Sequence, residues 1–419
     1  MLVALGMVAY EFYHLVKLSV SGFERLFPRH QPQSGLALAP LAVPASPNGQ
    51  ASAAYVGPSD SGNMAGSLGE KSPDVTGDDA TPGGESTPTP AETPPPVPAV
   101  PGGTIVGYGQ RVEAAAWITK ERKKDGFEEV ADFDQVKLAE KGWAIVGSSR
   151  IGRGHLQDGK YREDAIAAEM VDGKWHLAAV ADGGGSYKLA RLGAALAVRT
   201  AIEAMQRGLP KMAGEPGSHE AKVQRVVEHG LRTAFDALHE EAQRLQEEEE
   251  RKQSGVTVTV KDLRTTLLLV LHREFPNGVH LVAGGQVGDG AVVVRMIDGD
   301  ETKLEWLSEP DTGPQGNETT FLTDVPNTDE DWARRVKARL IGSSIVYCLA
   351  MTDGISDDFV PLEDNLERLE KPMFQAALGE KDPARAAEEL NDLLGYERQA
   401  SFDDRSLVCI YKQGMAPWK

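Results

Sequence analysis

Several carboxylates in this chain stand where an apolar run begins or ends. Asp182 follows "KWHLAAVA" and precedes three glycines, and Asp353 comes just after "SIVYCLAM". Asp164 opens the run "DAIAAEMV", and Asp403 lies shortly before "SLVCIYK". These runs are typical of buried β-strands, so the four side chains are expected at strand ends. Carboxylates at one edge repel one another unless a cation neutralises them, and their hard oxygen atoms favour Mg²⁺ or Mn²⁺ over a soft metal.

Aspartates also occur in tight turns, because Asp-Gly is a frequent sequence of two-residue hairpin loops. The segments "VDGK" (171–174) and "IDGD" (297–300) each join two strands with polar residues at the turn, and they are predicted hairpins. Asp289 in "QVGDGAVVV" fits either a hairpin turn or a functional site. On the residues alone, turn and cap aspartates remain an alternative to a metal site.

The elements that would position these carboxylates begin near residue 104, where the composition changes to short strands and long helices. Helices are predicted at 187–208 and 218–252, the second with apolar residues at helical spacing. Strands are predicted at 142–149, 164–171, 174–181, 264–274, 278–288, 291–297, 344–351 and 406–412. Strands that are interrupted by a helical pair and joined by hairpins indicate an α+β fold with antiparallel sheets covered by helices, not a doubly wound sheet.

The charge of the chain excludes one large class of partners. The sequence holds 44 Lys and Arg against 63 Asp and Glu, which gives a net charge of −19 and a pI near 5.0. A nucleic-acid partner is not expected, because such binding depends on cations that neutralise phosphates. Cys348 and Cys409 both lie in apolar runs without CxxC spacing, so they are predicted core thiols and not a disulfide or a metal site.

Two segments precede the expected domain at residues 104–419. Residues 1–30 are predicted to form an apolar helix, which charged residues interrupt. We therefore expect residues 1–27 to dock on a membrane surface or a partner, with a tilted membrane anchor and a misassigned start codon as the alternatives. Residues 31–103 are rich in Pro, Gly, Ser and Ala, and this composition predicts a disordered linker.

Six short motifs resemble, in order and approximate spacing, the metal-dependent Ser/Thr protein phosphatases of the protein phosphatase 2C (PPM) family. The motifs are "RED" (162–164), "VADGGGS" (180–186), "TTL" (265–267), "VGDG" (287–290), "MTDGISD" (351–357) and "DDRS" (403–406). The stretches "GSSRIGRGH" (147–155) and "SEPDTGPQGNETTFLTD" (308–324) look like the bacterial branch. The resemblance covers about residues 140–412. It implies a four-layer αββα sandwich of two antiparallel sheets flanked by helices, with a two-metal site in the cleft between the sheet edges.

The resemblance implies roles for individual residues. Asp182 matches the aspartate that bridges both metal ions, and the carbonyl of Gly183 matches a ligand of the second ion. Asp353 and Asp403 match two further ligands of the first ion. The glycines after Asp182 would let the backbone approach an ion closely and turn sharply into the helix.

The remaining acidic residues of the motifs are placed by the same resemblance. Glu163 and Asp164 match the acidic pair that enters the site from an early strand. Asp289 and Asp357 match ligands of a third, looser ion, which they would share with Asp353. Asp404 stands where the family commonly has an asparagine, and it is assigned no role.

Two features of the family are missing from the sequence. Gly159 stands where the family often has the arginine that holds the substrate phosphate, and Gly184 stands where eukaryotic members have a general-acid histidine. The cationic side chains that could replace the arginine are Lys160, Arg162, Arg153 and His155, unless these are ordinary solvated charges and a loop histidine. Protonation of the leaving group is then expected to rely on metal-bound water.

The resemblance implies a signalling hydrolase in which two Mn²⁺ or Mg²⁺ ions activate a water that attacks the phosphorus of phosphoserine or phosphothreonine. Asp182 and Asp164 are the expected catalytic carboxylates. The expected partners are phosphoproteins made by a Ser/Thr kinase, in the cytoplasm or at a membrane reached through residues 1–27. The alternative is a catalytically silent phosphoprotein-binding module of the same fold. A nucleotide-binding enzyme is disfavoured, because Lys188 in "GGGSYK" replaces the last glycine of GxGxxG.

Overall fold

Two antiparallel sheets form the centre of the domain. The computed structural model describes residues 120–122, 127, 129–214, 217–311, 318–379, 382–398 and 400–415. The helix predicted at 1–30 and the linker predicted at 31–103 lie outside the described residues. Among the helices that are described, none is long and apolar enough to cross a membrane.

The first sheet has six strands in the order β1-β2-β11-β10-β7-β8, and the second has five in the order β3-β4-β5-β6-β9. All neighbours in both sheets are antiparallel. The first sheet consists of β1 (Phe133–Glu140), β2 (Trp143–Arg150), β7 (Ala291–Asp298), β8 (Glu301–Trp306), β10 (Ser344–Met351) and β11 (Arg405–Lys412). The second consists of β3 (Ala165–Val171), β4 (Trp175–Ala181), β5 (Leu267–Glu274), β6 (His280–Val287) and β9 (Val336–Ile341).

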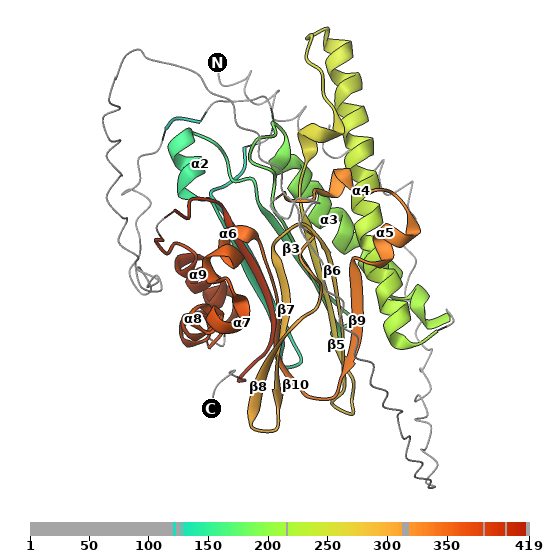
Figure 1. Cartoon of the computed structure of the whole chain (residues 1–419), viewed down its shortest axis with the longest axis vertical. Helices are drawn as coiled ribbons and strands as arrows, with labels where there is room; N and C mark the ends of the chain where they lie inside the picture. The colour runs from blue at the N-terminus through green and yellow to red at the C-terminus, as the bar shows by residue number, and fades with distance from the viewer. Residues whose placement is uncertain are drawn as a thin grey trace, which may run out of the picture. The chain divides into compact units, whose positions relative to one another are not determined.

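Helices cover the outer faces of both sheets, with α3 and α4 beyond the second sheet and α7 to α9 beyond the first (Figure 1). The long helices are α3 (Ala190–Gly208) and α4 (His219–Lys252), and on the other side lie α7 (Leu362–Asn365), α8 (Glu367–Pro372), a π-helical turn (Met373–Ala377) and α9 (Pro383–Leu393). The connections hold the short helices α2 (Arg153–Asp158), α5 (Asp329–Ala333) and α6 (Asp353–Ser356), and 3₁₀ turns at Lys211–Gly214, Val260–Leu263, Leu322–Asp324 and Asp357–Phe359. The predicted four-layer αββα sandwich is confirmed.

The eight predicted strands and both long helices are present, with ends that differ by up to three residues. The sequence shows no apolar run at β1, β8 or β9, although the predicted hairpin at 297–300 implies a strand where β8 lies. All three are edge strands, and their side chains are largely half-buried or exposed. An edge strand mixes polar and apolar residues because solvent reaches it, so it lacks a continuous apolar run. Cys348 and Cys409 are free and buried, as predicted.

The Asp-Gly segments at 172–173 and 298–299 form hairpin turns, whereas the one at 289–290 connects the two sheets. Asp172 and Gly173 have φ of 54° and 57°, as a type I′ hairpin requires, and Gly299 has φ of 66° in the second predicted hairpin. Both predicted hairpins are confirmed. The strands on either side of Asp289 belong to different sheets, so residues 288–290 cross from one sheet to the other and form no hairpin.

Side chains alternate along β4 between the helix-covered face and the space between the sheets. Leu177 and Ala179 pack with the helices, whereas Val180 packs between the sheets. The same period places His176 at one end of the inter-sheet layer and Asp182 at the other, roughly 20 Å away at the strand rise of about 3.3 Å per residue.

Three buried histidines on adjacent strands form a hydrogen-bonded chain, which we call the histidine ladder (His176, His272 and His280). His176 Nδ1 lies 2.9 Å from His272 Nδ1, and His272 Nε2 lies 3.1 Å from His280 Nδ1. Trp143 of the first sheet packs against all three rings, with its ring centroid 4.1 Å from that of His272. His272 uses both ring nitrogens in these contacts, so neither nitrogen is left to bind a cation. A neutral imidazole donates from one nitrogen and accepts at the other, so the chain of hydrogen bonds forms without a charge.

Burial lowers the pKa of each histidine in the ladder. The pKa of His176 falls to about 4, and that of His272 falls well below its usual range. Glu274 partly counteracts the shift at His176 and His280, whereas the charge of Lys412 reinforces it at His272 and His280. Glu140 also counteracts it at His176. The ladder is therefore uncharged at neutral pH.

The ladder should make the protein sensitive to acid. The unfolded chain takes up protons on these histidines near pH 6.5, whereas the folded chain does not until a lower pH. The contribution of the ladder to the free energy of unfolding therefore falls as the pH drops below about 6.5. At pH 5, each histidine that stays neutral in the fold should cost about 2 kcal/mol of the free energy of unfolding. Urea unfolding of the full chain in EDTA at pH 7.5 and pH 5 measures this loss by comparison with a variant that lacks the three histidines, because the buried carboxyl groups change the stability in the opposite direction.

The matched variant is the triple change His176→Leu, His272→Leu and His280→Leu, which removes the titrating groups from the same space. Other titrating groups contribute equally to both proteins, so the difference between their pH dependences isolates the ladder. Equal losses of stability in wild type and variant would show that the ladder does not titrate as described.

Candidate functional site

The turn that carries Asp182 is fixed by two threonines that lead into β5. The Asp182 N–H donates to Thr266 Oγ1 at 2.9 Å, and the Asp182 carbonyl accepts from the Thr266 N–H at 2.8 Å and from Thr265 Oγ1 at 2.9 Å. At Gly183 there is no room for a side chain, because a Cβ would lie 2.6 Å from the carbonyl oxygen of Glu163. The glycine therefore lets the segment before β3 pack directly on the turn after β4.

Asp164 reaches the same place from the start of β3. It is 3% exposed, and its Oδ2 accepts from Thr352 Oγ1 at 3.0 Å. The same threonine oxygen accepts from the Ser406 N–H at 3.1 Å. The Asp164 and Asp182 carboxyl groups also lie close enough for each to shift the pKa of the other. The beginning of β3, the end of β4, the end of β10 and the beginning of β11 thus meet at one point.

Like charges collect at this end of the two sheets. Burial raises the pKa of Asp182 well above its usual range, and the charges of Asp353 and Asp164 raise it further. Burial and then the charge of Asp404 act in the same direction on the pKa of Asp164. Both shifts favour the protonated carboxyl groups until a positive charge is brought near.

A second group of carboxylates adjoins the first through Asp353. Burial, followed by the charges of Asp289 and Asp403, raises the pKa of Asp353 to about 7. Partial desolvation and then the charge of Asp289 raise the pKa of Asp357. Asp289, Asp353 and Asp357, which are the residues expected to share a third ion, therefore lie together.

Two carboxylate oxygens in this region, Glu163 Oε2 and Asp289 Oδ1, are buried without a hydrogen-bond partner. Burial also raises the pKa of Glu163 to about 7, although His155 and Lys160 counteract the shift. A buried acceptor without a donor is costly, and a divalent cation with oxygen ligands relieves both that cost and the repulsion between carboxylates. The residues present therefore fit hard divalent cations such as Mg²⁺ or Mn²⁺.

Asp404, to which the sequence assigns no role, connects several segments of the site through its side chain. Its side chain is 1% exposed, and Oδ1 accepts from the Gly152 N–H at 2.6 Å and contacts His155 Nδ1 at 2.9 Å. Oδ2 accepts from the N–H groups of Glu163 at 2.6 Å and Asp164 at 3.3 Å. One carboxylate thus ties the start of β11 to α2 and to the acidic pair before β3. No local pattern could reveal this role, because the partners lie about 240 residues away in the sequence.

His155, Asp403 and Asp404 also bring three potential ligand atoms within 4.8 Å of one another. Because the oxygens of Asp404 already accept four contacts from the protein, we assign Asp404 to positioning and not to metal binding. Burial lowers the pKa of His155, but its hydrogen bond to Asp404 and the surrounding carboxylates outweigh that effect and raise the pKa to about 9. His155 is therefore a cation at neutral pH.

Two arginines named as possible phosphate ligands are engaged with the protein. Arg162 is 4% exposed, and its Nη1 donates to Ser149 Oγ and to the carbonyl of Asp164, both at 2.5 Å. Arg153 Nη1 donates to Glu397 Oε2 at 2.8 Å, and its guanidinium stacks 4.5 Å above the ring of Phe402. These contacts favour structural roles for both arginines.

Lys160 lies at the rim of the carboxylate group. Its side chain is 39% exposed, and Nζ lies 3.9 Å from Glu163 Oε1. Nζ also donates to the carbonyl of Gly185 at 2.5 Å, within the glycine turn after Asp182. Of the four cationic candidates, Lys160 combines the greatest exposure with direct proximity to a predicted ligand.

The turn that carries Asp289 is supported from behind by Gln286. Gln286 Nε2 donates to the carbonyls on both sides of Asp289, at 3.0 Å for Gly288 and 2.7 Å for Gly290. From the other side, Thr319 Oγ1 donates to Asp289 Oδ2 at 2.5 Å. Gln286 is a positioning residue that no sequence signal indicates.

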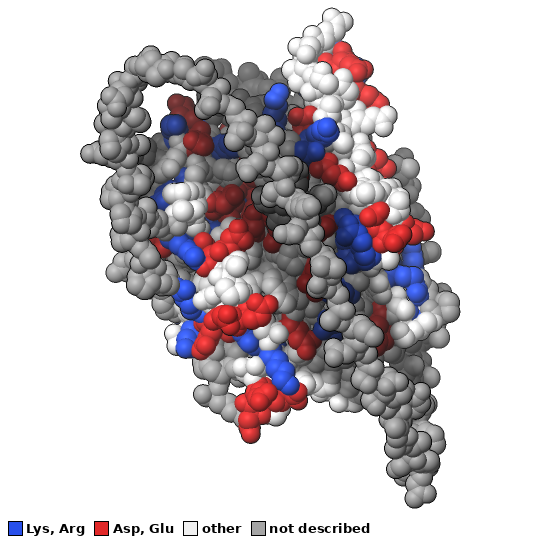
Figure 2. All heavy atoms as spheres, in the orientation of Figure 1, with Lys and Arg blue, Asp and Glu red and all other residues white. Residues whose placement is uncertain are grey.

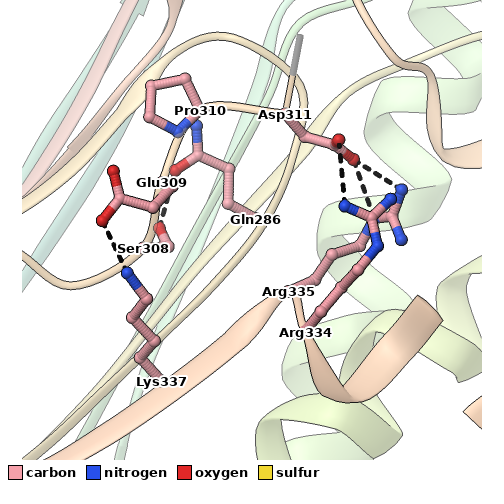
Figure 3. A pocket seen from close by; sticks show the side chains of 8 residues that line it. All are labelled: Gln286, Ser308, Glu309, Pro310, Asp311, Arg334, Arg335 and Lys337. Carbon is pink, nitrogen blue, oxygen red and sulfur yellow. Dashed lines mark hydrogen bonds and ion pairs between the residues drawn. The ribbon is translucent and has the colours of Figure 1, made fainter. Parts of the chain in front are cut away.

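A cavity of about 80 Å³ lies behind this turn (Figure 3). Ser308 Oγ donates to Gln286 Oε1 at 2.7 Å, and Arg335 Nε donates to Asp311 Oδ2 at 2.8 Å. Lys337 Nζ lies 2.6 Å from Glu309 Oε1. These charged groups are paired with one another, so they hold the segment after β8 in place. The cavity that they line is therefore not an open anion site.

The comparison with protein families gives a match that spans most of the domain. Residues 151–395, more than half of the chain, match the family model described as protein phosphatase 2C. No curated protein sequence matches the chain.

Several solved structures are similar to the chain at low identity. RsbX in complex with magnesium is 16% identical with a TM-score of 0.36, and the match covers 66% of this chain and 99% of RsbX. The serine-threonine phosphatase 2C from Toxoplasma gondii is 14% identical with a TM-score of 0.42, over 67% of this chain and 99% of that one. The serine/threonine phosphatase of S. agalactiae is 14% identical with a TM-score of 0.36, over 67% and 99%.

Removing one charge from the carboxylate group should stabilise the metal-free protein. The folded-state pKa of Asp353 lies at about 7, above its usual 3.8, so this group contributes stability at low pH that is lost as the pH rises through about 7. Asp182→Asn relieves the repulsion, and we expect a higher melting temperature than wild type in EDTA at pH 8. At a hundredfold excess over its dissociation constant, Mn²⁺ should stabilise wild type by about 2.7 kcal/mol and the variant by far less.

The control is Asp172→Asn at the tip of the β3–β4 hairpin, which should melt like wild type with and without Mn²⁺. A destabilised Asp182→Asn protein in EDTA, or one that Mn²⁺ stabilises as much as wild type, would contradict the assignment.

Proposed function

The chain belongs to the protein phosphatase 2C family, and on this premise we propose that it hydrolyses phosphoserine and phosphothreonine side chains of proteins. In this reaction the bond between phosphorus and the side-chain oxygen breaks, water supplies the new oxygen of the released phosphate, and the hydroxyl side chain is restored. The observation that carries the proposal is the group of desolvated carboxylates at one end of the two sheets, whose pKa values are raised by burial and by one another.

Two divalent cations, Mn²⁺ or Mg²⁺, are proposed to bind among these carboxylates. The proposed ligands are Asp164, Asp182, Asp353, Asp403, Glu163 and the carbonyl of Gly183. A third ion is proposed between Asp289, Asp357 and Asp353. When bound, the ions supply positive charge for the transfer of a phosphoryl group to water.

The chain's own side chains hold the ligands and meet the substrate. Thr352 orients Asp164 through its hydroxyl group, and Asp404 orients the backbone of Glu163 and Asp164. Lys160 is proposed to contact the substrate phosphate, because its ammonium group is exposed beside Glu163. His155, with Nε2 3.7 Å from Glu163 Oε2, is proposed to add a second positive charge there.

The cellular setting is proposed from the sequence. The motifs resemble the bacterial branch of the family, so we propose a signalling phosphatase that acts on the products of a Ser/Thr kinase. Its proposed location is the cytoplasm, with docking to a membrane surface or a partner through the apolar residues 1–27.

The central test is hydrolysis of a phosphoserine peptide by the full chain with Mn²⁺. We expect turnover in the wild type and almost none in Asp182→Asn, because a neutral amide cannot offset the charge of two divalent cations. Asp172→Asn should retain wild-type turnover, since Asp172 belongs to a hairpin. Release of inorganic phosphate, measured with Mn²⁺ and with EDTA, distinguishes these outcomes.

Two results would count against the proposal. If Asp182→Asn retains full turnover, the carboxylate assignment fails. If the wild type binds phosphopeptides and hydrolyses none of them with Mn²⁺ or Mg²⁺, the silent phosphoprotein-binding module replaces the enzyme.

Lys160→Gln tests the contact with the substrate phosphate. A charge-assisted hydrogen bond contributes about 1.5 to 3 kcal/mol, so kcat/KM for the phosphoserine peptide should fall by about tenfold or more. The matched control is Lys174→Gln, an exposed lysine at the β3–β4 hairpin, which should leave kcat/KM unchanged. Equal kinetics for the two variants would remove Lys160 from the site.

A further inference from the structure

A buried carboxylate beside the candidate metal centre has no part in the proposed function. Asp358 directly follows Asp357 and is 7% exposed. Its Oδ2 accepts from Tyr396 OH at 2.6 Å and from Ser401 Oγ at 2.9 Å, and its Oδ1 lies 3.5 Å from Arg398 Nε. All three partners belong to the loop between α9 and β11, which also carries two aspartates of the site.

Arg405 closes the network from the other end of this loop. Its Nη1 donates to the carbonyls of Leu394 at 3.1 Å and Tyr396 at 2.7 Å, and its Nη2 donates to Ser401 Oγ at 2.8 Å. The same Nη2 lies 3.7 Å from Asp358 Oδ2, and the guanidinium stacks 3.9 Å above the Tyr396 ring. The loop is therefore held at several points by one buried carboxylate and one buried guanidinium.

The network joins two segments of the site through neighbouring residues. Asp358 is the residue after Asp357, and Arg405 is the residue after Asp404. The backbones of the two segments also touch, because a Cβ at Gly354 would lie 2.0 Å from the carbonyl oxygen of Asp404. A shift of the loop would therefore move its aspartates relative to those that follow β10.

We propose that Asp358 is a positioning residue for the metal centre. Without binding an ion, it fixes the loop of residues 394–404 so that Asp403 stays beside Asp353. This inference rests on the metal centre of the proposed function. Side chains that orient metal ligands typically change metal affinity by about 10 to 100-fold when they are replaced.

The test is calorimetric titration of the full chain with Mn²⁺, together with its melting temperature in EDTA. Asp358→Asn keeps the size of the side chain but removes the charge that faces Arg405, and we expect the dissociation constant of Mn²⁺ to rise by about tenfold or more. A purely structural residue would lower the melting temperature and leave the affinity unchanged, so the two measurements separate these roles.

The chain offers a matched control in Glu370, on α8. Glu370 is 2% exposed, accepts a hydrogen bond from Tyr347 OH and pairs with Arg295 Nη2 at 2.6 Å, so it repeats the combination of carboxylate, tyrosine and arginine on the outer face of the first sheet. Glu370→Gln should lower the melting temperature and leave the dissociation constant of Mn²⁺ within about twofold of wild type.

Two results would overturn the inference: wild-type Mn²⁺ affinity in Asp358→Asn, or an equal loss of affinity in Glu370→Gln. If Asp358→Asn does not fold, Tyr396→Phe removes one donor to Asp358, and unchanged Mn²⁺ affinity in that variant would equally overturn it. A wild type that binds Mn²⁺ but hydrolyses no phosphopeptide contradicts only the proposed function. A wild type that binds no Mn²⁺ contradicts both.

Discussion

Several carboxylates are held close together at one end of the two packed sheets, and most of the hydrogen bonds around them keep them there. Asp164 and Asp182 lie close enough for each to shift the pKa of the other, and the pKa of Asp353 is raised to about 7 by burial and its acidic neighbours. Such an arrangement opposes folding when the groups are ionised. The apolar clusters between the sheets and under the helices supply the stability that offsets this cost.

The layer between the sheets has two polar ends of opposite character. At one end, burial and mutual repulsion favour protonated carboxyl groups around Asp182, and at the other, burial favours neutral histidines around His272. Apolar side chains such as Val180 and Val270 fill the space between. Because the alternation along β4 places His176 and Asp182 on the same face, the strand that ends at the site also begins at the histidine ladder.

The proposed ligands depend on side chains that would bind no ion. Asp404 gathers the N–H groups of Glu163 and Asp164, Gln286 holds the carbonyls on both sides of Asp289, and Asp358 holds the loop before β11. Each places a buried polar group where several segments without regular structure meet. Such hydrogen bonds are strengthened by the low local dielectric, so few side chains suffice to fix the geometry.

The sequence by itself determined the parts of the protein that depend on local periodicity. Apolar runs predicted strands such as β4, helical spacing predicted α4, and "VDGK" predicted a hairpin, because burial of one face leaves a repeat in the chain. The order of the acidic motifs also indicated which aspartates would meet. The edge strands β1, β8 and β9 left no such repeat, since solvent reaches them. Only the tertiary structure decided that Asp289 lies on a crossing between sheets and that Arg162 is buried against Ser149. It also decided that Asp404 and Asp358 are hydrogen-bonded to distant segments beside the site. These roles arise from contacts between segments far apart in the sequence, and such contacts exist only once the two sheets have closed on each other.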